Sequence, residues 1–282
     1  MRKKSIEILR EALQKNTAVG AFNTSNMETS QGIVRAAEEL KKPCIIQATT
    51  TAIEYSNDVI GRIVKDVIDK ESGKAKVGFH LDHGHNLHDI IKAIDLGVDS
   101  VMIDASKMSF SENLEITKKV VEYAHPKGVA VQAELGRVPY LGREKMSVDW
   151  SKVMTVPQEA KKLVDDTGID ALAVAIGNAH GFFREKSEPD WERLREIRKL
   201  LPETPLILHG ASDWEDGKAE KAIKNGINCF NIDTDIRIAF CTVICNMSSG
   251  KHCEVNDPRK ILGAAREEVK NKVKEKIKMF AV

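Results

Sequence analysis

The sequence has almost no net charge and no long uninterrupted run of apolar residues. Its 43 Lys and Arg residues nearly balance its 42 Asp and Glu residues, which leaves a formal net charge of +1. A chain without a basic excess lacks the electrostatic footprint for a phosphate polymer, so nucleic-acid binding is not expected. No apolar run approaches the roughly 18 residues that a membrane span requires, and Glu7, Arg10 and Glu11 interrupt any apolar export signal. These absences favour a cytoplasmic protein that binds neither nucleic acid nor membrane.

Cysteines are also few, and their spacing forms no recognisable framework. There are five, which is an odd number. No CxxC pattern occurs, and the chain is too long to need disulfides for a stable core. We therefore expect reduced thiols, as in a cytoplasmic protein. Cys241 and Cys245 are four residues apart and could be ligands on one helical turn, but small residues on a helix face explain the spacing more simply.

What the sequence does contain is eight short apolar runs, each followed by an amphipathic stretch of ten or more residues. The runs are continuous rather than alternating, as expected for parallel strands covered on both faces. The eight predicted strands are Ala18–Asn23, Pro43–Thr49, Val77–Asp82, Ser100–Asp104, Val129–Glu134, Ala171–Ile176, Pro205–His209 and Asn228–Ile232.

The stretches between these runs carry helix signals. Asp190 is a good N-cap, and Asp257-Pro258 starts a further helix after the last strand. Eight strand–helix alternations plus this C-terminal helix predict an α/β fold of the (β/α)₈ TIM-barrel type rather than an open doubly wound sheet. No linker-like segment interrupts the chain, so residues 1–282 are predicted to form a single TIM-barrel domain.

Polar residues within the apolar runs are concentrated at the carboxyl ends of the predicted strands, where TIM barrels hold their catalytic residues. His83, His180 and His209 follow three different strands. Three imidazoles leave one coordination position open, which is the arrangement of a catalytic zinc site. Asp82 directly precedes one of these histidines and could act beside the metal as a general acid or base.

The loops after the last strands indicate a phosphate site. Gly181 and Gly210 follow two of the histidines, and without a Cβ they let backbone N–H groups approach an anion. Ser212 and Thr234 add hydroxyls in the loops after strands seven and eight, the usual phosphate site of this fold. The expected ligand is a phosphorylated small molecule.

Taken together, these stretches resemble the class II, metal-dependent family of fructose- and tagatose-bisphosphate aldolases. The resemblance extends from residue 21 to about residue 240 and includes the Asp-Pro-Arg of the last predicted helix. The matching stretches are Ala21-Phe-Asn-Thr-Ser-Asn, His80-Leu-Asp-His-Gly, Ser100-Val-Met-Ile-Asp-Ala-Ser, Ala133-Glu-Leu-Gly, Leu172-Ala-Val-Ala-Ile-Gly-Asn-Ala-His-Gly, Leu208-His-Gly-Ala-Ser and Asn231-Ile-Asp-Thr-Asp.

The resemblance implies reversible cleavage of a ketose 1,6-bisphosphate to dihydroxyacetone phosphate and glyceraldehyde 3-phosphate. It implies one zinc ion per chain on His83, His180 and His209, with Asp82 moving the proton of the C4 hydroxyl. Glu134 matches a glutamate that sometimes binds a displaced metal, and a carboxylate inside the barrel is the equally open alternative. His80 and Asp104 are expected to orient the ligands.

The resemblance also assigns substrate contacts and an assembly. Around the dihydroxyacetone phosphate half it places Gly181, Gly210, Ala211, Ser212, Asn231, Asp233 and Thr234, and near the distal phosphate Asn23, Thr49 and Arg237. It allows a monovalent cation near the phosphate and implies a homodimer or homotetramer, in which the arginine can reach a neighbouring subunit.

The sequence departs from the family pattern in three places: the first bears on the second proton-transfer step, and the other two leave the substrate's distal group open. The loop at residues 137–144 contains a proline and only one acidic residue, Glu144. Asp213 stands where relatives commonly have glycine, and residues 49–51 are three threonines. By the same resemblance, Asp233 and Arg237 imply fructose 1,6-bisphosphate rather than tagatose 1,6-bisphosphate, and another phosphorylated ketose is a further alternative.

Two other classes of function are weaker alternatives. His83-Gly84-His85 has a spacing found in metal-dependent hydrolases, but the first predicted strand ends without a histidine. The altered loop at residues 137–144 suggests a catalytically silent binding protein. The presence of Asp82 and all three histidines argues against this alternative. No lysine interrupts the predicted strands, so an aldolase that uses a Schiff base is not expected.

Overall fold

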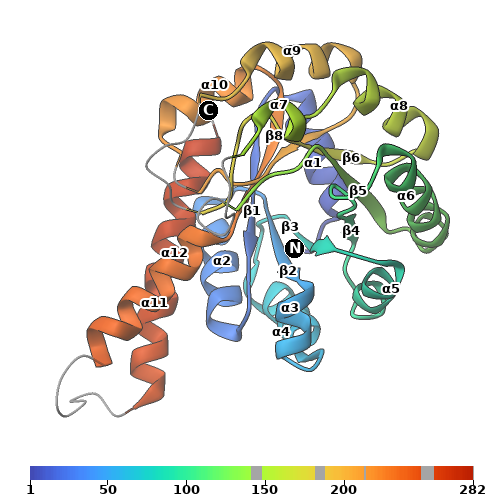
Figure 1. Ribbon diagram of the computed structural model, residues 1–282. Helices are drawn as coiled ribbons and strands as arrows, with labels where there is room; N and C mark the ends of the chain where they lie inside the picture. The colour runs from blue at the N-terminus through green and yellow to red at the C-terminus, as the bar shows by residue number, and fades with distance from the viewer. Residues whose placement is uncertain (141–147, 182–187, 213, 249–256, 282) are drawn as a thin grey trace.

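The computed structural model describes residues 1–140, 148–181, 188–212, 214–248 and 257–281. Eight parallel strands pair in sequence order, and the last pairs with the first to close a barrel (Figure 1). The predicted TIM barrel is therefore confirmed. The strands are β1 (Val19–Asn23), β2 (Cys44–Thr49), β3 (Val77–Gly84), β4 (Ser100–Ile103), β5 (Ala130–Leu135), β6 (Ala171–Val174), β7 (Leu206–Leu208) and β8 (Ile227–Ile232).

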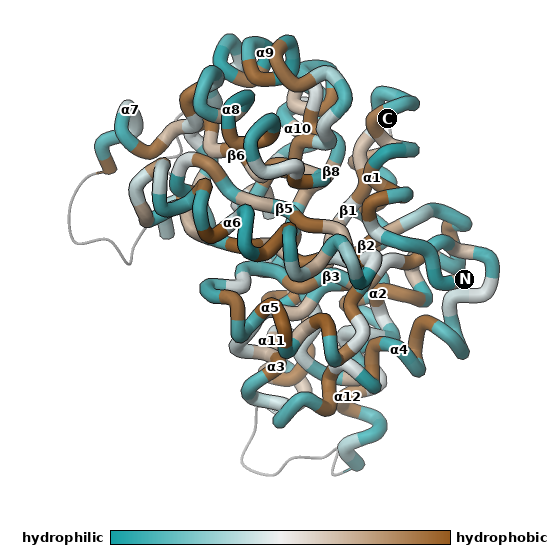
Figure 2. The backbone as a smooth tube through the Cα atoms, turned by 90° about the vertical axis from the view of Figure 1, so that its right-hand side faces the viewer, coloured by the Kyte–Doolittle hydropathy of each residue, from teal (hydrophilic) through white to brown (hydrophobic). Residues whose placement is uncertain are grey.

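Helices surround the barrel, and most of them alternate between hydrophilic and hydrophobic residues along their length (Figure 2). The predicted caps are present, since the Asp190 side chain accepts from the Arg193 N–H and Asp257 from the Arg259 N–H. The described helices are α1 (Ser5–Gln14), α2 (Met27–Leu40), α3 (Thr50–Tyr55), α4 (Val59–Glu71), α5 (Leu87–Asp95), α6 (Phe110–Ala124), the 3₁₀ helix η1 (His125–Lys127), α7 (Trp150–Val153), α8 (Pro157–Thr167), α9 (Trp191–Leu200), α10 (Asp216–Lys224), α11 (Thr234–Ser248) and α12 (Pro258–Phe280).

The core has two layers. The larger layer lies between the strands and the surrounding helices. The smaller layer fills the barrel itself, where Ile8 and Leu9 of α1 cluster with Ile45 and Ile207 from the strands. Helix α1 packs against the amino-terminal end of the barrel, and the polar residues of the site lie at the opposite, carboxyl-terminal end.

The last helix is confirmed as an addition to the eightfold pattern. Helix α12 packs against α2 and α11 along one edge of the barrel (Figure 1). Of its apolar positions Leu262, Ala265, Val269, Val273 and Ile277, which the helical spacing places on one face, the last four are buried and Leu262 is partly buried. The contact with α2 is close, because a Cβ on Gly32 would lie only 2.7 Å from Val269 Cγ1. The absence of a side chain at this position therefore sets how closely the two helices approach.

No helix in the described ranges is both long and apolar enough to cross a membrane. The four cysteines in these ranges are free thiols: Cys44 and Cys229 are buried, and Cys241 and Cys245 are exposed on α11.

The contact between α2 and α12 yields a test of the packing. Replacing Gly32 with Ala should gain up to about 1 kcal/mol of helix propensity. Overpacking against the stiff Val269 side chain and the Arg266 carbonyl should cost about 1–3 kcal/mol. We therefore expect Gly32→Ala to lower the free energy of unfolding by about 1–2 kcal/mol, measured by urea denaturation.

Gly217→Ala is the matched control. Gly217 is an exposed residue of α10, and a Cβ there would have nothing within 4 Å. The control should be stabilised by about 0.5–1 kcal/mol. Equal stabilisation of both variants would contradict the close packing of α2 and α12.

Candidate metal and substrate site

Asp82 and His83 are adjacent near the end of β3, where the strand departs from regular pairing. The register with β4 shifts after Leu81, and His83 has a left-handed backbone with φ of 53°. Consecutive side chains of a regular strand point to opposite faces, whereas an irregularity can redirect one of them. Here both reach the same site, since Asp82 bonds Asn23 and His83 bonds His209. Strained backbone of this kind is concentrated at functional sites. Strand β3 extends beyond its predicted end because pairing with β4 resumes at Gly84, opposite Ile103.

The three predicted metal-binding histidines converge at the open end of the barrel. His83 comes from β3, His180 follows β6 and His209 follows β7. One ring nitrogen from each lies within 4.8 Å of the other two, and the His83 Nε2 to His209 Nδ1 distance is 3.1 Å. The fold thus brings together three imidazoles that are far apart in the sequence.

These histidines fit a divalent transition metal. Imidazole nitrogens bind zinc at about 2.0–2.1 Å, which places two tetrahedral ligands about 3.4 Å apart. Asp104 accepts a 2.9 Å hydrogen bond from His83 Nδ1 and leaves Nε2 facing the other rings, the outer hydrogen bond typical of metal-binding histidines. Burial alone would lower the pKa of His83, but Asp82 and Asp104 raise it to about 10. The site therefore favours positive charge where a cation would bind.

Glu134 lies at the end of β5 beside this cluster. It is buried, and one of its oxygens lies within 4.8 Å of ligand atoms of His83 and Asp104. Burial and the negative charge of Asp104 raise the pKa of Glu134 to about 8. His83, Asp104 and Glu134 are residue types that could form a second metal position. The role of Glu134 as an alternative ligand stays a prediction.

The Asp82 carboxylate is held by two amides. Its Oδ2 accepts from Asn23 Nδ2 at 2.8 Å and its Oδ1 from Asn231 Nδ2 at 3.1 Å. Burial by itself would raise the pKa of Asp82. The charges of His83 and His209 and the Asn23 hydrogen bond outweigh burial and lower that pKa below its ordinary value. Asp82 is therefore an ionised acceptor at neutral pH, the state that a general base requires.

The loops after β6 and β7 pack directly on each other beside the histidines. Gly210 has φ of 66°, and a Cβ on it would lie 2.3 Å from the Ala179 carbonyl oxygen. Only glycine fits such a position. Asn178 Nδ2 donates to the His209 carbonyl at 2.9 Å and thereby joins the two loops. Gly181 also has a left-handed φ, of 86°, with open space around its Cα.

The remaining predicted contacts lie around this centre. Ala211, Ser212 and Asn231 are buried, whereas the others lie nearer the surface. Thr49 ends β2 and caps α3 by accepting from the Ala52 N–H, and Thr234 begins α11.

Arg237 is exposed and forms a 3.0 Å ion pair with Asp233. Burial raises the pKa of Asp233, against the opposing effect of Arg237. The arginine is therefore partly neutralised within its own chain. His80, which we expected to orient a ligand, instead bonds Ser100 Oγ at 2.7 Å through its Nδ1.

The structure adds two residues that the sequence analysis missed. Gln47, fully buried in β2, donates to Asn23 Oδ1 at 2.7 Å. Gln47 is a polar residue in the middle of the apolar run Pro43–Thr49, and this position could have indicated a functional role. Tyr140 stacks on the His180 ring with a centroid distance of 4.3 Å and an interplanar angle of 15°, and no sequence pattern indicated it. Glu144 and Asp213 lie outside the described residues.

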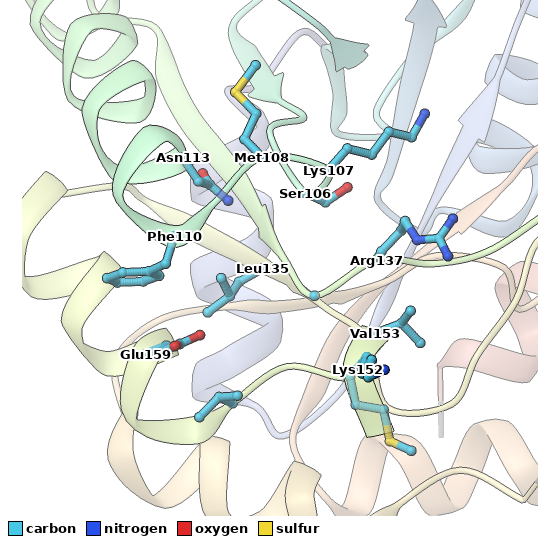
Figure 3. Close-up of a pocket in the computed structure, with 13 residues that line it drawn as sticks. Ser106, Lys107, Met108, Phe110, Asn113, Leu135, Arg137, Lys152, Val153 and Glu159 are labelled. Carbon is cyan, nitrogen blue, oxygen red and sulfur yellow. The ribbon is translucent and has the colours of Figure 1, made fainter. Parts of the chain in front are cut away.

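A cavity of about 440 Å³ lies next to the site, between the loop after β4 and the segment after β5. Phe110 and Leu135 lie on one side of it, and Lys107 and Arg137 on the other (Figure 3). Its lining includes none of the predicted site residues. Two lining residues connect the cavity to the site: Ser106 Oγ donates to Asp104 Oδ1 at 2.7 Å, and Asn113 Nδ2 donates to the Glu134 carbonyl oxygen at 2.9 Å.

Comparison with known proteins agrees with this geometry. The family model "Fructose-bisphosphate aldolase class-II" matches residues 3–282. A fructose-bisphosphate aldolase of Thermus caldophilus is 42% identical, covering 98% of this chain and 96% of the relative. That of Giardia intestinalis is 40% identical, covering 97% of this chain and 91% of the relative.

Among solved structures, the YdjI aldolase from Escherichia coli K12 superposes with a TM-score of 0.87 at 32% identity, covering 99% of this chain and 97% of that chain. The family model and these relatives each match nearly the whole chain, which carries the three-histidine site at the carboxyl ends of its strands. The chain therefore belongs to the class II fructose-bisphosphate aldolase family.

Proposed function

We propose that this aldolase reversibly cleaves fructose 1,6-bisphosphate to dihydroxyacetone phosphate and glyceraldehyde 3-phosphate, with one zinc ion held by His83, His180 and His209. The observation that carries the proposal is the convergence of these imidazoles beside the ionised carboxylate of Asp82. Membership in the class II family and relatives named fructose-bisphosphate aldolase support the same reaction and substrate.

Asp82 is the proposed proton carrier. Breaking the C3–C4 bond requires loss of the proton on the C4 hydroxyl, and the ionised Asp82 accepts it and returns it during condensation. Asn23 and Asn231 hold the two carboxylate oxygens in place. The electron pair remains on C3 next to the ketone, and a zinc ion would supply the positive charge that stabilises it.

The proposed phosphate contacts follow from the loops. Backbone N–H groups at Gly181, Gly210 and Ala211 and the hydroxyls of Ser212 and Thr234 would hold the dihydroxyacetone phosphate end. A monovalent cation could assist there. Asn231 and Asp233 would contact the sugar hydroxyls, and the proposed distal phosphate contacts are Asn23, Thr49 and Arg237.

We also propose that residues 1–282 act as one domain within a cytoplasmic homodimer or homotetramer. Tyr55, Val59 and Ile238 are exposed at 85%, 46% and 48%, and an interface between copies of the chain would bury such side chains. The free thiols support a reducing compartment.

The alternatives differ in substrate or in chemistry. A tagatose 1,6-bisphosphate aldolase or an aldolase for another phosphorylated ketose would use the same site. The hydrolase alternative is weakened because His85 is exposed and is absent from the described groups that could hold a metal. A silent binding protein has no need for the ionised Asp82.

A panel of phosphorylated ketoses tests the substrate. With zinc present, we expect fructose 1,6-bisphosphate to give the highest kcat/KM, measured as triose phosphate release, and EDTA to abolish it. A higher value for tagatose 1,6-bisphosphate would reassign the substrate within the family. Hydrolysis of an ester or amide without carbon–carbon cleavage would contradict the proposal.

Removing the proposed proton carrier should separate catalysis from metal binding. Asp82→Ala should lower kcat by about 10²-fold or more because C4 deprotonation loses its base. Zinc content by elemental analysis should stay near one per chain. Full activity in this variant would exclude Asp82 from the mechanism.

Removing a proposed zinc ligand should instead abolish both metal binding and catalysis. His209→Ala leaves two imidazoles, so bound zinc and activity should fall together. His85→Ala is the matched control, because this exposed histidine lies two residues from His83 on the same segment. An active His209→Ala protein that retains its zinc would contradict the ligand assignment.

A further inference from the structure

Lys276 is a buried cation outside the catalytic centre. It lies on α12, with 3% of its surface exposed. Its Nζ is 2.9 Å from Asp235 Oδ2 and donates to the Ser212 carbonyl oxygen at 2.5 Å. Burying an ammonium group is costly unless it is paired and hydrogen-bonded. Both conditions are met here, so the position of the ammonium group is defined by two partners.

These two partners belong to the two loops proposed to bind phosphate. Ser212 lies in the Gly210–Ser212 segment, which belongs to the loop after β7. Asp235 follows Asp233 and Thr234 at the start of α11, after β8. Lys276 lies on α12, the helix added after the eight strand–helix units of the barrel. It therefore links the two loops to each other through a third part of the chain.

The contact with Ser212 constrains the backbone rather than a side chain. A peptide unit is planar, so fixing its carbonyl also limits the conformations of the neighbouring units. The left-handed Gly210 is two residues away and has no side chain to restrict its backbone. An external hydrogen bond is thus a direct way to hold this segment in one conformation.

We propose that Lys276 is a positioning residue for the phosphate subsite. By holding the Ser212 carbonyl and Asp235 at fixed positions, it preorganises the N–H and hydroxyl groups of the two loops for a phosphate dianion. Preorganisation lowers the ordering cost of binding, so its effect falls on affinity and not on the proton transfer at Asp82. This inference rests on the proposed phosphate site.

Lys276→Met tests the inference because it keeps a long side chain and removes the charge. We expect the KM for fructose 1,6-bisphosphate to rise about tenfold, as for loss of one charged hydrogen bond, with kcat changed less than about threefold. Zinc content should stay at the wild-type value, and Lys276→Arg should restore most of the KM. A purely structural lysine would lower stability without this division between KM and kcat.

Binding of inorganic phosphate alone, measured by calorimetry on the zinc-loaded protein, gives a readout independent of turnover. We expect its affinity to fall about tenfold in Lys276→Met. If the wild-type protein bound phosphate but did not cleave fructose 1,6-bisphosphate, the proposed substrate would fail while the role of Lys276 could still be measured.

A second variant covers a failure to fold. Lys276→Met leaves Asp235 buried and unpaired, whereas Lys276→Met/Asp235→Asn removes both charges and should fold. The double variant should show the same loss of phosphate affinity. Wild-type KM and phosphate affinity in either folded variant would overturn the proposal, as would a fall in kcat with KM unchanged.

Discussion

Three carboxylates surround His83 in the mouth of the barrel: those of Asp82 and Glu134 are buried, and that of Asp104 is partly buried. Ionising all three carboxylates away from water is unfavourable unless positive charge balances them. The pKa values reflect this constraint: burial and Asp104 raise the pKa of Glu134, while Asp82 and Asp104 raise the pKa of His83. A divalent cation among the imidazoles would balance the same charges permanently. The other features of the site are arranged around this requirement.

The barrel meets this requirement by bringing distant strand ends together. Closure by β1 and β8 places Asn231 beside Asp82, and the β6 and β7 loops join through Asn178. Helix α1 packs against the amino-terminal end, and the polar groups lie at the carboxyl-terminal end. Helix α12 adds a contact from outside the barrel, since its Lys276 bonds both loops that flank the proposed phosphate site.

Most of the fold could be predicted because continuous apolar runs mark buried parallel strands. The differences lie at strand ends. The strand predicted at Pro205–His209 is only Leu206–Leu208 in the structure, because its last residues turn into the loop that carries the site. The strand predicted to end at Asp82 continues to Gly84, because its pairing with β4 resumes there after a register shift that no local sequence pattern predicts.

The site was predictable to a different extent for each kind of residue. The histidines and Asp82 follow apolar runs, so their convergence followed from the barrel. Gln47 carried the same signal within its run. Tyr140 lies on a loop and Lys276 on an outer helix, and only tertiary packing places Tyr140 against His180 and Lys276 against Ser212. Lys276 in particular looks like one more charged residue of a solvated helix until its burial is known.

The central claim is that one metal ion sits between His83, His180 and His209. Anomalous diffraction at the zinc absorption edge, on crystals of the active protein, tests it most directly. The account predicts one strong peak per chain at about 2.0–2.1 Å from a nitrogen of each imidazole. No peak there, or a peak bound by other residues, would contradict it.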